Sequence, residues 1–424
     1  MRALYTAALF LAQPLVAFHL AWRGLRNRGY WRHWPQRFGL PPAAIKGPYD
    51  LWIHAVSVGE TQVALPLVRT LQRRRPGLRV LVTTTTPTGM ARLREAGAGA
   101  FELCYLPQDL PPMVGRFLDR VRPRLAVFVE TELWPNYLAA LAQRRTRVVL
   151  ANARLSERSR RGYARFGALT REMLGNLSVA AAQSAADGAR LAALGLPLER
   201  LVVTGSVKFD QEIPASIREK AQVLRRRMGV EREVWIAAST HEGEEEAVLE
   251  AHERLRRCFP DALLLLVPRH PERFERVHGL AVRRGFATAR RTDSGADWRA
   301  AEVVIGDTMG ELLLFYAAAD VAFVGGSLVA RGGHNVLEPA ALGLPVVTGP
   351  HVFNFQEITD LLVDRGAAVR LAGGERLAGV VEEWLGDANL RHRVGACGRR
   401  VVVENRGALG RLADTLEHLL DAPH

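Results

Sequence analysis

The sequence is poor in cysteine, with only three among 424 residues, and these lie far apart in the chain. This scarcity argues against a disulfide framework or a cysteine metal site and fits a reducing compartment. The sequence also lacks zinc-ligand spacing, RNA-binding signatures and basic segments interleaved with aromatic residues, so nucleic-acid binding has no support. No short internal repeat and no low-complexity segment occurs.

Acidic residues are outnumbered by basic ones, with 44 Asp and Glu against 57 Lys and Arg, and the formal net charge is +13. This excess predicts an anionic partner, either an anionic membrane or a phosphorylated substrate. Hydrophobic residues make up 48% of the chain and charged residues 24%, which is typical of a globular protein. A chain of this length accommodates two or three domains, each with its own core.

The sequence contains one long apolar run, residues 3–22, which is long enough to span a bilayer or to lie in it. Five arginines follow within residues 23–37, whereas a signal peptide carries its positive charge before the apolar run. The positive-inside rule then places the globular part in the cytoplasm. Pro14 and His19 favour an interfacial anchor over a deep span, and a buried first helix is the alternative.

Beyond residue 50, apolar strands alternate with amphipathic stretches in two successive series. Near-continuous apolar strands joined by helices indicate parallel sheets covered on both faces. We therefore predict two doubly wound α/β domains, with a ligand cleft at the carboxyl ends of both sheets. The first series of strands is expected at 51–56, 79–86, 101–107, 125–131, 147–153, 179–183 and 201–205. The second series is expected at 234–239, 262–268, 303–306, 321–325 and 345–348.

The same pattern predicts the domain boundaries. We expect an anchor and basic segment over residues 1–40, a first domain over 41–210, a polar linker that includes a helix over 211–230, a second domain over 231–405 and a C-terminal helix over 406–424 that returns to the first domain.

Polar clusters follow nearly every predicted strand, which indicates a site for a polar, anionic ligand. In the first domain these clusters include SVGE (57–60), ETELWPN (130–136) and GSVKFD (205–210). In the second domain, STHEGEE (239–245) follows the first strand, and Thr240 is expected to cap a helix whose first turn holds Glu244 and Glu245.

The longest of these clusters is VGGSLVARGGHNVLEPA (324–340), which passes from a strand through four glycines into a helix expected near Asn335. Glycines at such a junction let backbone N–H groups approach a ligand, and the start of a helix favours negative charge. Glu338, one turn into this helix, is placed to accept hydrogen bonds from two sugar hydroxyls. An ordinary glycine-rich loop is the alternative for this stretch taken alone.

Together these motifs resemble the bacterial Kdo transferases, which add 3-deoxy-D-manno-oct-2-ulosonic acid (Kdo) to a lipid A precursor. The resemblance covers nearly the whole chain and extends to TTTTPTG (83–89), ANARLS (151–156), VPRHPER (267–273), GDTMGEL (306–312) and GPHVFNF (349–355). It implies a GT-B fold of two Rossmann-like domains with a membrane-associated N-terminal helix. The first domain would bind the acceptor and the second the donor.

The resemblance also implies a reaction and a location. The expected activity is an inverting glycosyltransferase that moves Kdo from CMP-Kdo to lipid IVA, a tetra-acylated disaccharide 1,4′-bisphosphate, in lipopolysaccharide biosynthesis. The expected location is the cytoplasmic face of the inner membrane, where the N-terminal helix and the basic segment meet anionic lipids.

The resemblance places donor binding on seven residues of the second domain, namely Arg269, His270, Met309, Gly310, Glu311, Asn335 and Glu338. The chemistry agrees, because Arg269 suits the CMP phosphate and Glu338 suits the ribose diol. Lys208 is our candidate for the Kdo carboxylate, with a solvated surface lysine as the alternative. We expect no cofactor and no metal, because CMP leaves with a single phosphate and no DxD-like acidic pair is placed to hold a cation.

One departure from the family concerns the general base. The family segment after the anchor has the form G-E-R-x-G, and its glutamate is the implied base, but this chain has Gln36 there, which cannot take a proton. Three explanations are open: another base, with Glu60 and Glu132 as candidates, a deliberate Glu→Gln substitution, or a loose alignment. The acceptor-binding residues are expected to be Ser57, Gly59, Arg37 and Glu130.

Two other functions remain open on the sequence alone. One is a different GT-B transferase that uses a UDP-sugar on a lipid acceptor. The other is a catalytically silent membrane-bound binder of the lipid or the nucleotide, motivated by Gln36. Stabilisation of the fold by CMP but not by UMP would favour the Kdo transferase over a transferase that uses a UDP-sugar. Turnover of CMP-Kdo would exclude the catalytically silent binder.

Overall fold

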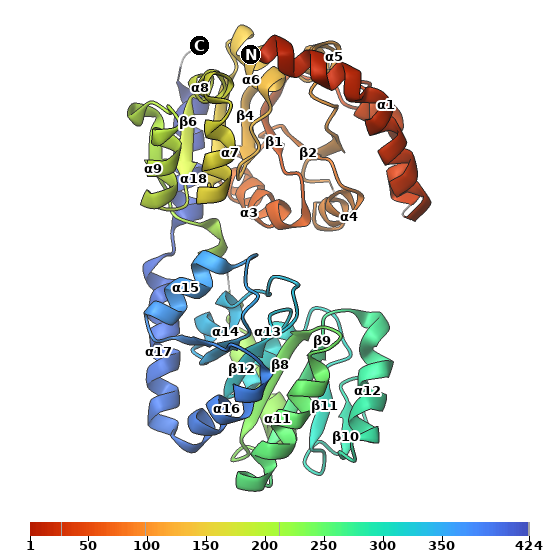
Figure 1. Cartoon of the computed structure of the whole chain (residues 1–424), viewed down its shortest axis with the longest axis vertical. Coiled ribbons are helices and arrows are strands. Elements are labelled where there is room, and N and C mark those ends of the chain that lie inside the picture. The colour runs from red at the N-terminus through yellow and green to blue at the C-terminus, as the bar shows by residue number, and fades with distance from the viewer. Residues whose placement is uncertain (27, 98, 212, 423–424) are drawn as a thin grey trace. The chain divides into compact units, whose positions relative to one another are not determined.

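The computed structural model describes residues 1–26, 28–97, 99–211 and 213–422. The chain forms two compact units, Met1–Asp210 with Arg406–His424 as unit 1 and Gln211–Asn405 as unit 2 (Figure 1). Each unit contains a seven-stranded sheet whose neighbouring strands are parallel, with helices on both faces. The predicted class, two doubly wound α/β units, is confirmed.

The sheet of unit 1 has the order β3-β2-β1-β4-β5-β6-β7. Its strands are β1 Tyr49–His54, β2 Val80–Thr84, β3 Glu102–Tyr105, β4 Pro123–Val129, β5 Arg147–Ala153, β6 Val179–Ala182 and β7 Leu201–Val203. The helices are α1 Arg2–Arg26, α2 Trp34–Arg37, α3 Val58–Arg74, α4 Pro87–Ala96, α5 Pro111–Val121, α6 Pro135–Gln143, α7 Glu157–Ala164, α8 Gly167–Gly175, α9 Ala185–Ala193 and α18 Ala408–Asp421. Single 3₁₀ turns lie at Arg28–Tyr30, Leu198–Arg200 and Val207–Phe209.

Aromatic side chains fill one face of this sheet. Trp52 on β1 is fully buried, and its ring lies 5.2 Å from Phe117, 5.4 Å from Phe128 and 5.7 Å from Tyr137. Aromatic pairs at such separations add about 0.5–1.5 kcal/mol each to the area they bury. This packing fixes the strands whose carboxyl ends carry the polar motifs.

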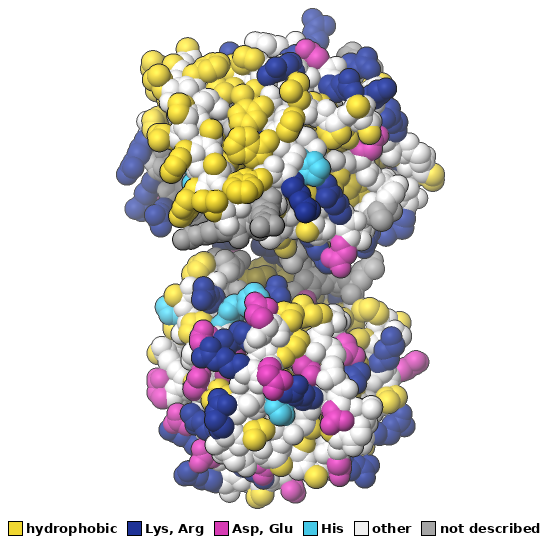
Figure 2. All heavy atoms as spheres, turned by 90° about the vertical axis from the view of Figure 1, so that its right-hand side faces the viewer, with side chains coloured by type: hydrophobic (Ala, Val, Ile, Leu, Met, Phe, Trp, Pro, Cys, Tyr) yellow, Lys and Arg dark blue, Asp and Glu magenta, His cyan; other side chains and the backbone are white. Residues whose placement is uncertain are grey.

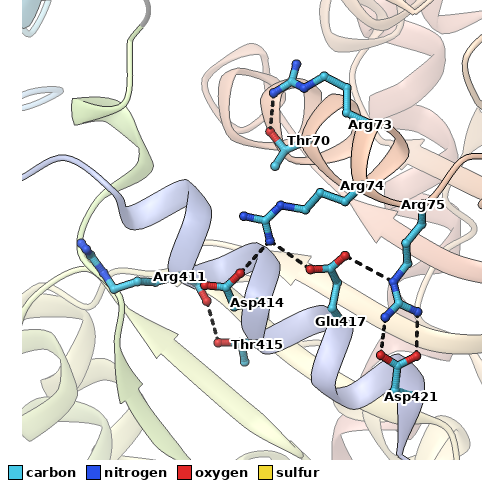
Figure 3. A network of polar contacts seen from close by, with 9 residues as sticks. All are labelled: Thr70, Arg73, Arg74, Arg75, Arg411, Asp414, Thr415, Glu417 and Asp421. Carbon is cyan, nitrogen blue, oxygen red and sulfur yellow. Dashed lines mark hydrogen bonds and ion pairs between the residues drawn. The ribbon is translucent and has the colours of Figure 1, made fainter.

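The C-terminal helix α18 packs on the other face of the unit 1 sheet. Leu412, Leu416 and Leu420 are buried in the same core cluster as the α3 side chains. At the rim, Arg74 donates to Asp414 at 2.6 Å and to Glu417 at 2.9 Å, and Arg75 pairs with Asp421 and Glu417 (Figure 3). Exposed ion pairs contribute little each, so the buried leucines supply most of the attachment.

The sheet of unit 2 has the order β10-β11-β9-β8-β12-β13-β14. Its strands are β8 Val234–Thr240, β9 Leu263–Pro268, β10 Thr288–Arg290, β11 Val303–Ile305, β12 Val321–Val324, β13 Val346–Thr348 and β14 Ala368–Arg370. The helices are α10 Ile217–Met228, α11 Glu245–Cys258, α12 Phe274–Arg283, α13 Leu312–Ala318, α14 Leu337–Leu342, α15 Gln356–Asp364, α16 Leu377–Gly386 and α17 Ala388–Glu404. Short 3₁₀ turns lie at Pro271–Arg273 and Gly374–Arg376.

Three features of unit 2 differ from expectation. The edge strands β10 and β14 were not predicted, because each has three residues and ends in an arginine. Most of the predicted linker is helix α10, whose Leu224 and Met228 are buried in the core of unit 2. The helix expected near Asn335 begins at Leu337.

Both sheets have a point at which the strand order reverses. In unit 1 this point lies between β1 and β4, and in unit 2 between β8 and β12. In open parallel sheets, ligands bind outside the carboxyl ends of the strands at such a point, because the two following loops diverge there. Glu130 after β4 and Ser239 in β8 adopt left-handed φ angles of 61° and 56°, and such backbone strain gathers at functional sites.

Candidate active site

Glu60 occupies the switch point of unit 1, in the first turn of α3. Its Oε2 accepts from the Val56 N–H at 2.6 Å and its Oε1 from the Ser57 hydroxyl at 2.8 Å, while Ser57 caps the Glu60 N–H at 3.4 Å. This reciprocal pattern is a capping box, which fixes the carboxylate. Burial, opposed by the Val56 hydrogen bond and reinforced by the charge of Glu132, raises the pKa of Glu60 to about 7. A carboxylate with this pKa is suited to general base catalysis.

Two further carboxylates come from the loop after β4, directly beside β1 in the sheet. Glu132 accepts from the Trp134 indole at 2.8 Å, and burial raises its pKa. Glu130 Oε1 lies 3.8 Å from Lys208 Nζ. Lys208 follows Val207, whose N–H donates to Asn152 Oδ1 at 3.0 Å. Lys208 is therefore held in unit 1 with its side chain only 15% exposed, so the alternative of a solvated surface lysine is wrong.

Gln36 lies in the short helix α2 and is 8% exposed. Its Oε1 accepts from the backbone N–H of Tyr105 at the end of β3, at 2.9 Å. This bond gives the side chain a structural role that glutamine and glutamate oxygens both fulfil. The neighbouring Arg37 is also buried, and its Nη1 donates to the Thr85 carbonyl at 2.8 Å.

Glu244 organises the switch point of unit 2. It is fully buried and accepts from four backbone N–H groups, those of His241 at 2.9 Å, Gly326 at 2.7 Å, Ser327 at 3.0 Å and Leu328 at 2.9 Å. The carboxylate thereby ties the glycine loop after β12 to the turn after β8. The sequence predicted Thr240 as the helix cap, but Thr240 is the last residue of β8, and α11 begins at Glu245 with Glu244 in the N-cap position.

A pair of histidines lies above this loop. Nε2 of His241 and Nε2 of His334 are 2.8 Å apart, and the two rings are parallel within 5°. A Cβ on Gly326 would lie 2.9 Å from the His334 ring, so only glycine fits there. Burial, with the nearby charges of His270 and Arg269, lowers the pKa of both histidines to about 4, and His241 lowers that of His334 further. One ring therefore donates to the other as a neutral pair.

The other predicted donor residues of unit 2 occupy loops that follow neighbouring strands. Arg269 and His270 follow β9 and are exposed, and the His270 ring lies 5.3 Å from His241. Met309 is 61% exposed, and Gly310 has a φ of 84°. These four side chains and backbone groups are accessible to a ligand.

Glu311 differs from these residues because it is already paired. Arg291 donates to both of its oxygens at 3.0 and 2.8 Å, and Thr308 donates at 2.5 Å. Burial acts to raise its pKa, but these hydrogen bonds outweigh that effect and lower it. Arg291 was not anticipated from the sequence, and Glu311 acts with it as a unit.

Glu338 lies in the first turn of α14. Its Oε1 accepts from Asn335 Nδ2 at 3.0 Å, while Asn335 Oδ1 accepts from the Leu337 N–H at 3.0 Å. Burial raises the pKa of Glu338. The carboxylate is thus oriented by Asn335 and keeps accepting capacity for a polar ligand.

Helix α1 presents an apolar surface on unit 1. One stretch, Arg2–Leu25, is long and apolar enough to cross a membrane. Its Leu11 is 82% exposed, Leu15 72% and Phe18 70%, and hydrophobic side chains cover much of this face in Figure 2. The first turns are tied to unit 1, because Tyr5 donates to Asp109 and Thr6 to Asn136, each at 3.0 Å. The side chains of Arg26 and Arg28 in the basic segment lie outside the described residues.

Comparison with known proteins gives consistent matches. Residues 32–211 match the family model described as 3-deoxy-D-manno-octulosonic-acid transferase (kdotransferase). A 3-deoxy-D-manno-octulosonic acid transferase of Haemophilus influenzae is 42% identical over 422 residues, 99% of each chain. The enzyme of the same name from Bordetella pertussis is 38% identical over 431 residues, again 99% of each chain.

Among solved structures, UDP-GlcNAc 2-epimerase from Neisseria meningitidis, bound to UDP-GlcNAc, aligns with a TM-score of 0.57 and 11% identity. The alignment covers 87% of this chain and 99% of that one. At this identity the likeness concerns the fold alone, and it agrees with two Rossmann-like units of the GT-B type.

Proposed function

This chain belongs to the family of 3-deoxy-D-manno-octulosonic acid transferases, and from that premise we propose that it transfers Kdo from CMP-Kdo to lipid IVA with inversion at the anomeric carbon. The observation that carries the chemistry is the buried Glu60 carboxylate at the switch point of unit 1, whose pKa is raised to about 7. Near neutral pH such a group is present in both protonation states. A general base must take up a proton and release it again in every catalytic cycle.

In the proposed reaction, Glu60 takes the proton of the acceptor hydroxyl while that oxygen attacks the anomeric carbon of Kdo. The bond from this carbon to the CMP phosphate oxygen breaks, and CMP leaves with the electron pair. Attack on the face opposite the leaving group inverts the anomeric centre. Lys208, which is paired with Glu130, is our candidate in unit 1 for a cation that contacts the Kdo carboxylate or the departing phosphate.

Binding of the CMP portion is assigned to unit 2. Arg269 and the neutral His241–His334 pair offer donors for the phosphate, and Glu338 accepts from the ribose hydroxyls. We propose no metal, because a single phosphate leaves and the Arg269 guanidinium can pair with its charge.

We expect Glu338→Ala to weaken CMP binding by about 1–3 kcal/mol, because two buried ribose hydroxyls would lose their acceptor. Isothermal titration calorimetry measures this change, and UMP is expected to bind at least tenfold more weakly than CMP to the unmodified chain (about 1.4 kcal/mol). The exposed Glu253, on α11 of the same unit, provides the control variant Glu253→Ala. Unchanged CMP affinity in Glu338→Ala would remove the ribose assignment, and equal affinity for UMP would favour a UDP-sugar donor.

We propose that α1 holds the protein at the cytoplasmic face of the inner membrane by lying in the interface. Its hydrogen bonds to Asp109 and Asn136 keep it alongside unit 1, which is compatible with an interfacial helix. Replacing Leu11 and Leu15 together by glutamate should lower binding to anionic vesicles by about tenfold or more. Burying one leucine side chain contributes about 1.5–3 kcal/mol of free energy, and both contributions would be lost. Vesicle flotation measures this, with Val223→Glu on α10, 60% exposed, as the control. Equal flotation of both variants would contradict the assignment.

A further inference from the structure

A cavity of about 280 Å³ lies between α1 and the body of unit 1. From α1 it is lined by the apolar Leu9, Val16 and Leu20 together with Tyr5 and Gln13, and from the body by Arg37, Thr85, the segment 106–110 and Trp134. Ligand pockets for whole small molecules span about 300–1,000 Å³, so this cavity is at the lower limit and suits one chain or group of a larger ligand. Its α1 wall belongs to the helix whose other side exposes apolar residues.

Two polar side chains line this apolar cavity with unused donors. Arg37 is 5% exposed, and its Nε and Nη2 are buried without a hydrogen-bond partner within the described parts of the chain. The same holds for Nε2 of Gln108. Gln108 and Arg37 are also joined directly, because the Gln108 N–H donates to the Arg37 carbonyl at 3.1 Å. A buried donor without an acceptor costs about 1–3 kcal/mol, and a charged one costs more.

Arg37 forms no ion pair with Asp109, the acidic residue that lines the same cavity, within the described parts of the chain. Asp109 accepts from the Tyr137 N–H at 2.8 Å, the Asn136 N–H at 3.0 Å and the Tyr5 hydroxyl at 3.0 Å, so its oxygens serve α6 and α1. The Arg37 guanidinium instead lies 4.1 Å from the centre of the Tyr105 ring. Burial lowers the pKa of Arg37, and the nearby Tyr105 and Tyr30 oppose this shift only in part. An anion against Nε and Nη2 would offset the cost of burying this charge.

We propose that this cavity binds one acyl chain of an anionic phosphorylated lipid along α1, with a phosphate or ester oxygen of that lipid accepting from Arg37 and Gln108. The apolar wall and the convergent donors match the two ends of such a molecule. The lipid is either the acylated bisphosphate acceptor, which rests on the proposed function, or a membrane phospholipid, which does not. The site supplies a reason for Arg37 to be buried beside Gln36 instead of facing solvent as Arg23 and Arg32 do.

Quenching of Trp134 fluorescence tests this proposal in the full chain, because bromine atoms on an acyl chain quench a tryptophan on contact. The signal is the difference between the unmodified chain and Trp134→Phe, measured in nanodiscs with dibrominated phosphatidylglycerol and, separately, with added dibrominated lipid IVA. We expect one or both lipids to quench this difference signal. The lipid that quenches identifies the source.

Two variants make the test specific. Leu9→Phe narrows the cavity from α1 without adding a second tryptophan, and Gln108→Leu removes one donor with little change in volume. Each variant is compared with the same variant carrying Trp134→Phe, and neither requires a change at Arg37. Both variants, and Arg37→Met if it folds, should lower the apparent lipid affinity in the quenching titration by about tenfold. The variant at Leu9 reduces the volume open to the acyl chain, whereas the variants at Gln108 and Arg37 each remove a hydrogen bond to the charged lipid. Arg92→Met, at an exposed arginine paired with Glu95, is the charge-matched control.

No quenching by either lipid, or equal quenching in the unmodified chain, Leu9→Phe and Gln108→Leu, would overturn the proposal. Its failure is distinguishable from failure of the proposed function. Kdo transfer without Trp134 quenching removes only the lipid site, whereas phosphatidylglycerol quenching without Kdo transfer removes only the enzymatic assignment.

Discussion

Replacing Glu60 by glutamine is expected to lower the rate of Kdo transfer by about 10²–10⁴-fold, the usual cost of losing a general base. The amide preserves the size of the side chain and still accepts from the Val56 N–H, so the turn should keep its conformation. CMP affinity, assigned to unit 2, should remain unchanged. Rate measurements with CMP-Kdo and lipid IVA, together with CMP titrations, separate a catalytic loss from a structural one.

The raised pKa of Glu60 also predicts how the rate depends on pH. A base acts only when deprotonated, so the transfer rate should increase with pH through about 7 and level off above it. The increase should be absent in Glu60→Gln. The parallel variant Gln36→Glu is expected to bring no gain in rate, because that side chain bonds the Tyr105 N–H. A large gain in Gln36→Glu, with little loss in Glu60→Gln, would place the base at position 36.

Replacing Glu244 by glutamine should destabilise unit 2 by roughly 3–5 kcal/mol, as when one partner of a buried charged network is lost. The amide has one oxygen where the carboxylate has two, and its NH₂ group would face backbone N–H donors that now meet an acceptor. We expect the amides of Gly326, Ser327 and Leu328 to lose protection against hydrogen exchange, and CMP binding to weaken with them.

The exposed Glu246, two residues further along in α11, offers the matched control Glu246→Gln, which should leave exchange and stability unchanged. Hydrogen exchange read by mass spectrometry localises the effect to the glycine loop. Retained protection of Gly326–Leu328 in Glu244→Gln would show that the loop does not depend on this carboxylate.

The architecture was predictable because buried parallel strands are apolar along their whole length. Strands such as β8 and β9 are entirely buried, so their sequences show no alternation of polar and apolar residues. The edge strands β10 and β14 escaped prediction because three residues ending in arginine carry too little apolar signal. The stretch that contains α10 was predicted as a linker with a helix, and its packing in unit 2 was missed because its charged face hides Leu224 and Met228, which are buried.

The site was predictable only in part, since local sequence shows where a polar loop lies but not what it bonds. Glu60 was identifiable because a serine three residues before a glutamate, directly after a strand, is a capping signature. Glu244 resembled an ordinary helix-start acid, and its four partners are mostly more than eighty residues away. The His241–His334 pair likewise joins two distant motifs. Gln36 drew attention through family likeness, and only its bond to Tyr105 reveals the structural role.

Mass spectrometry of lipid IVA, after incubation with CMP-Kdo and the unmodified chain that carries Gln36, tests directly whether Glu60 supports Kdo transfer. We expect the lipid to gain the mass of one or more Kdo residues, and we expect this gain to be lost when Glu60→Gln replaces the unmodified chain. An unchanged lipid mass with folded protein that binds CMP would contradict this expectation.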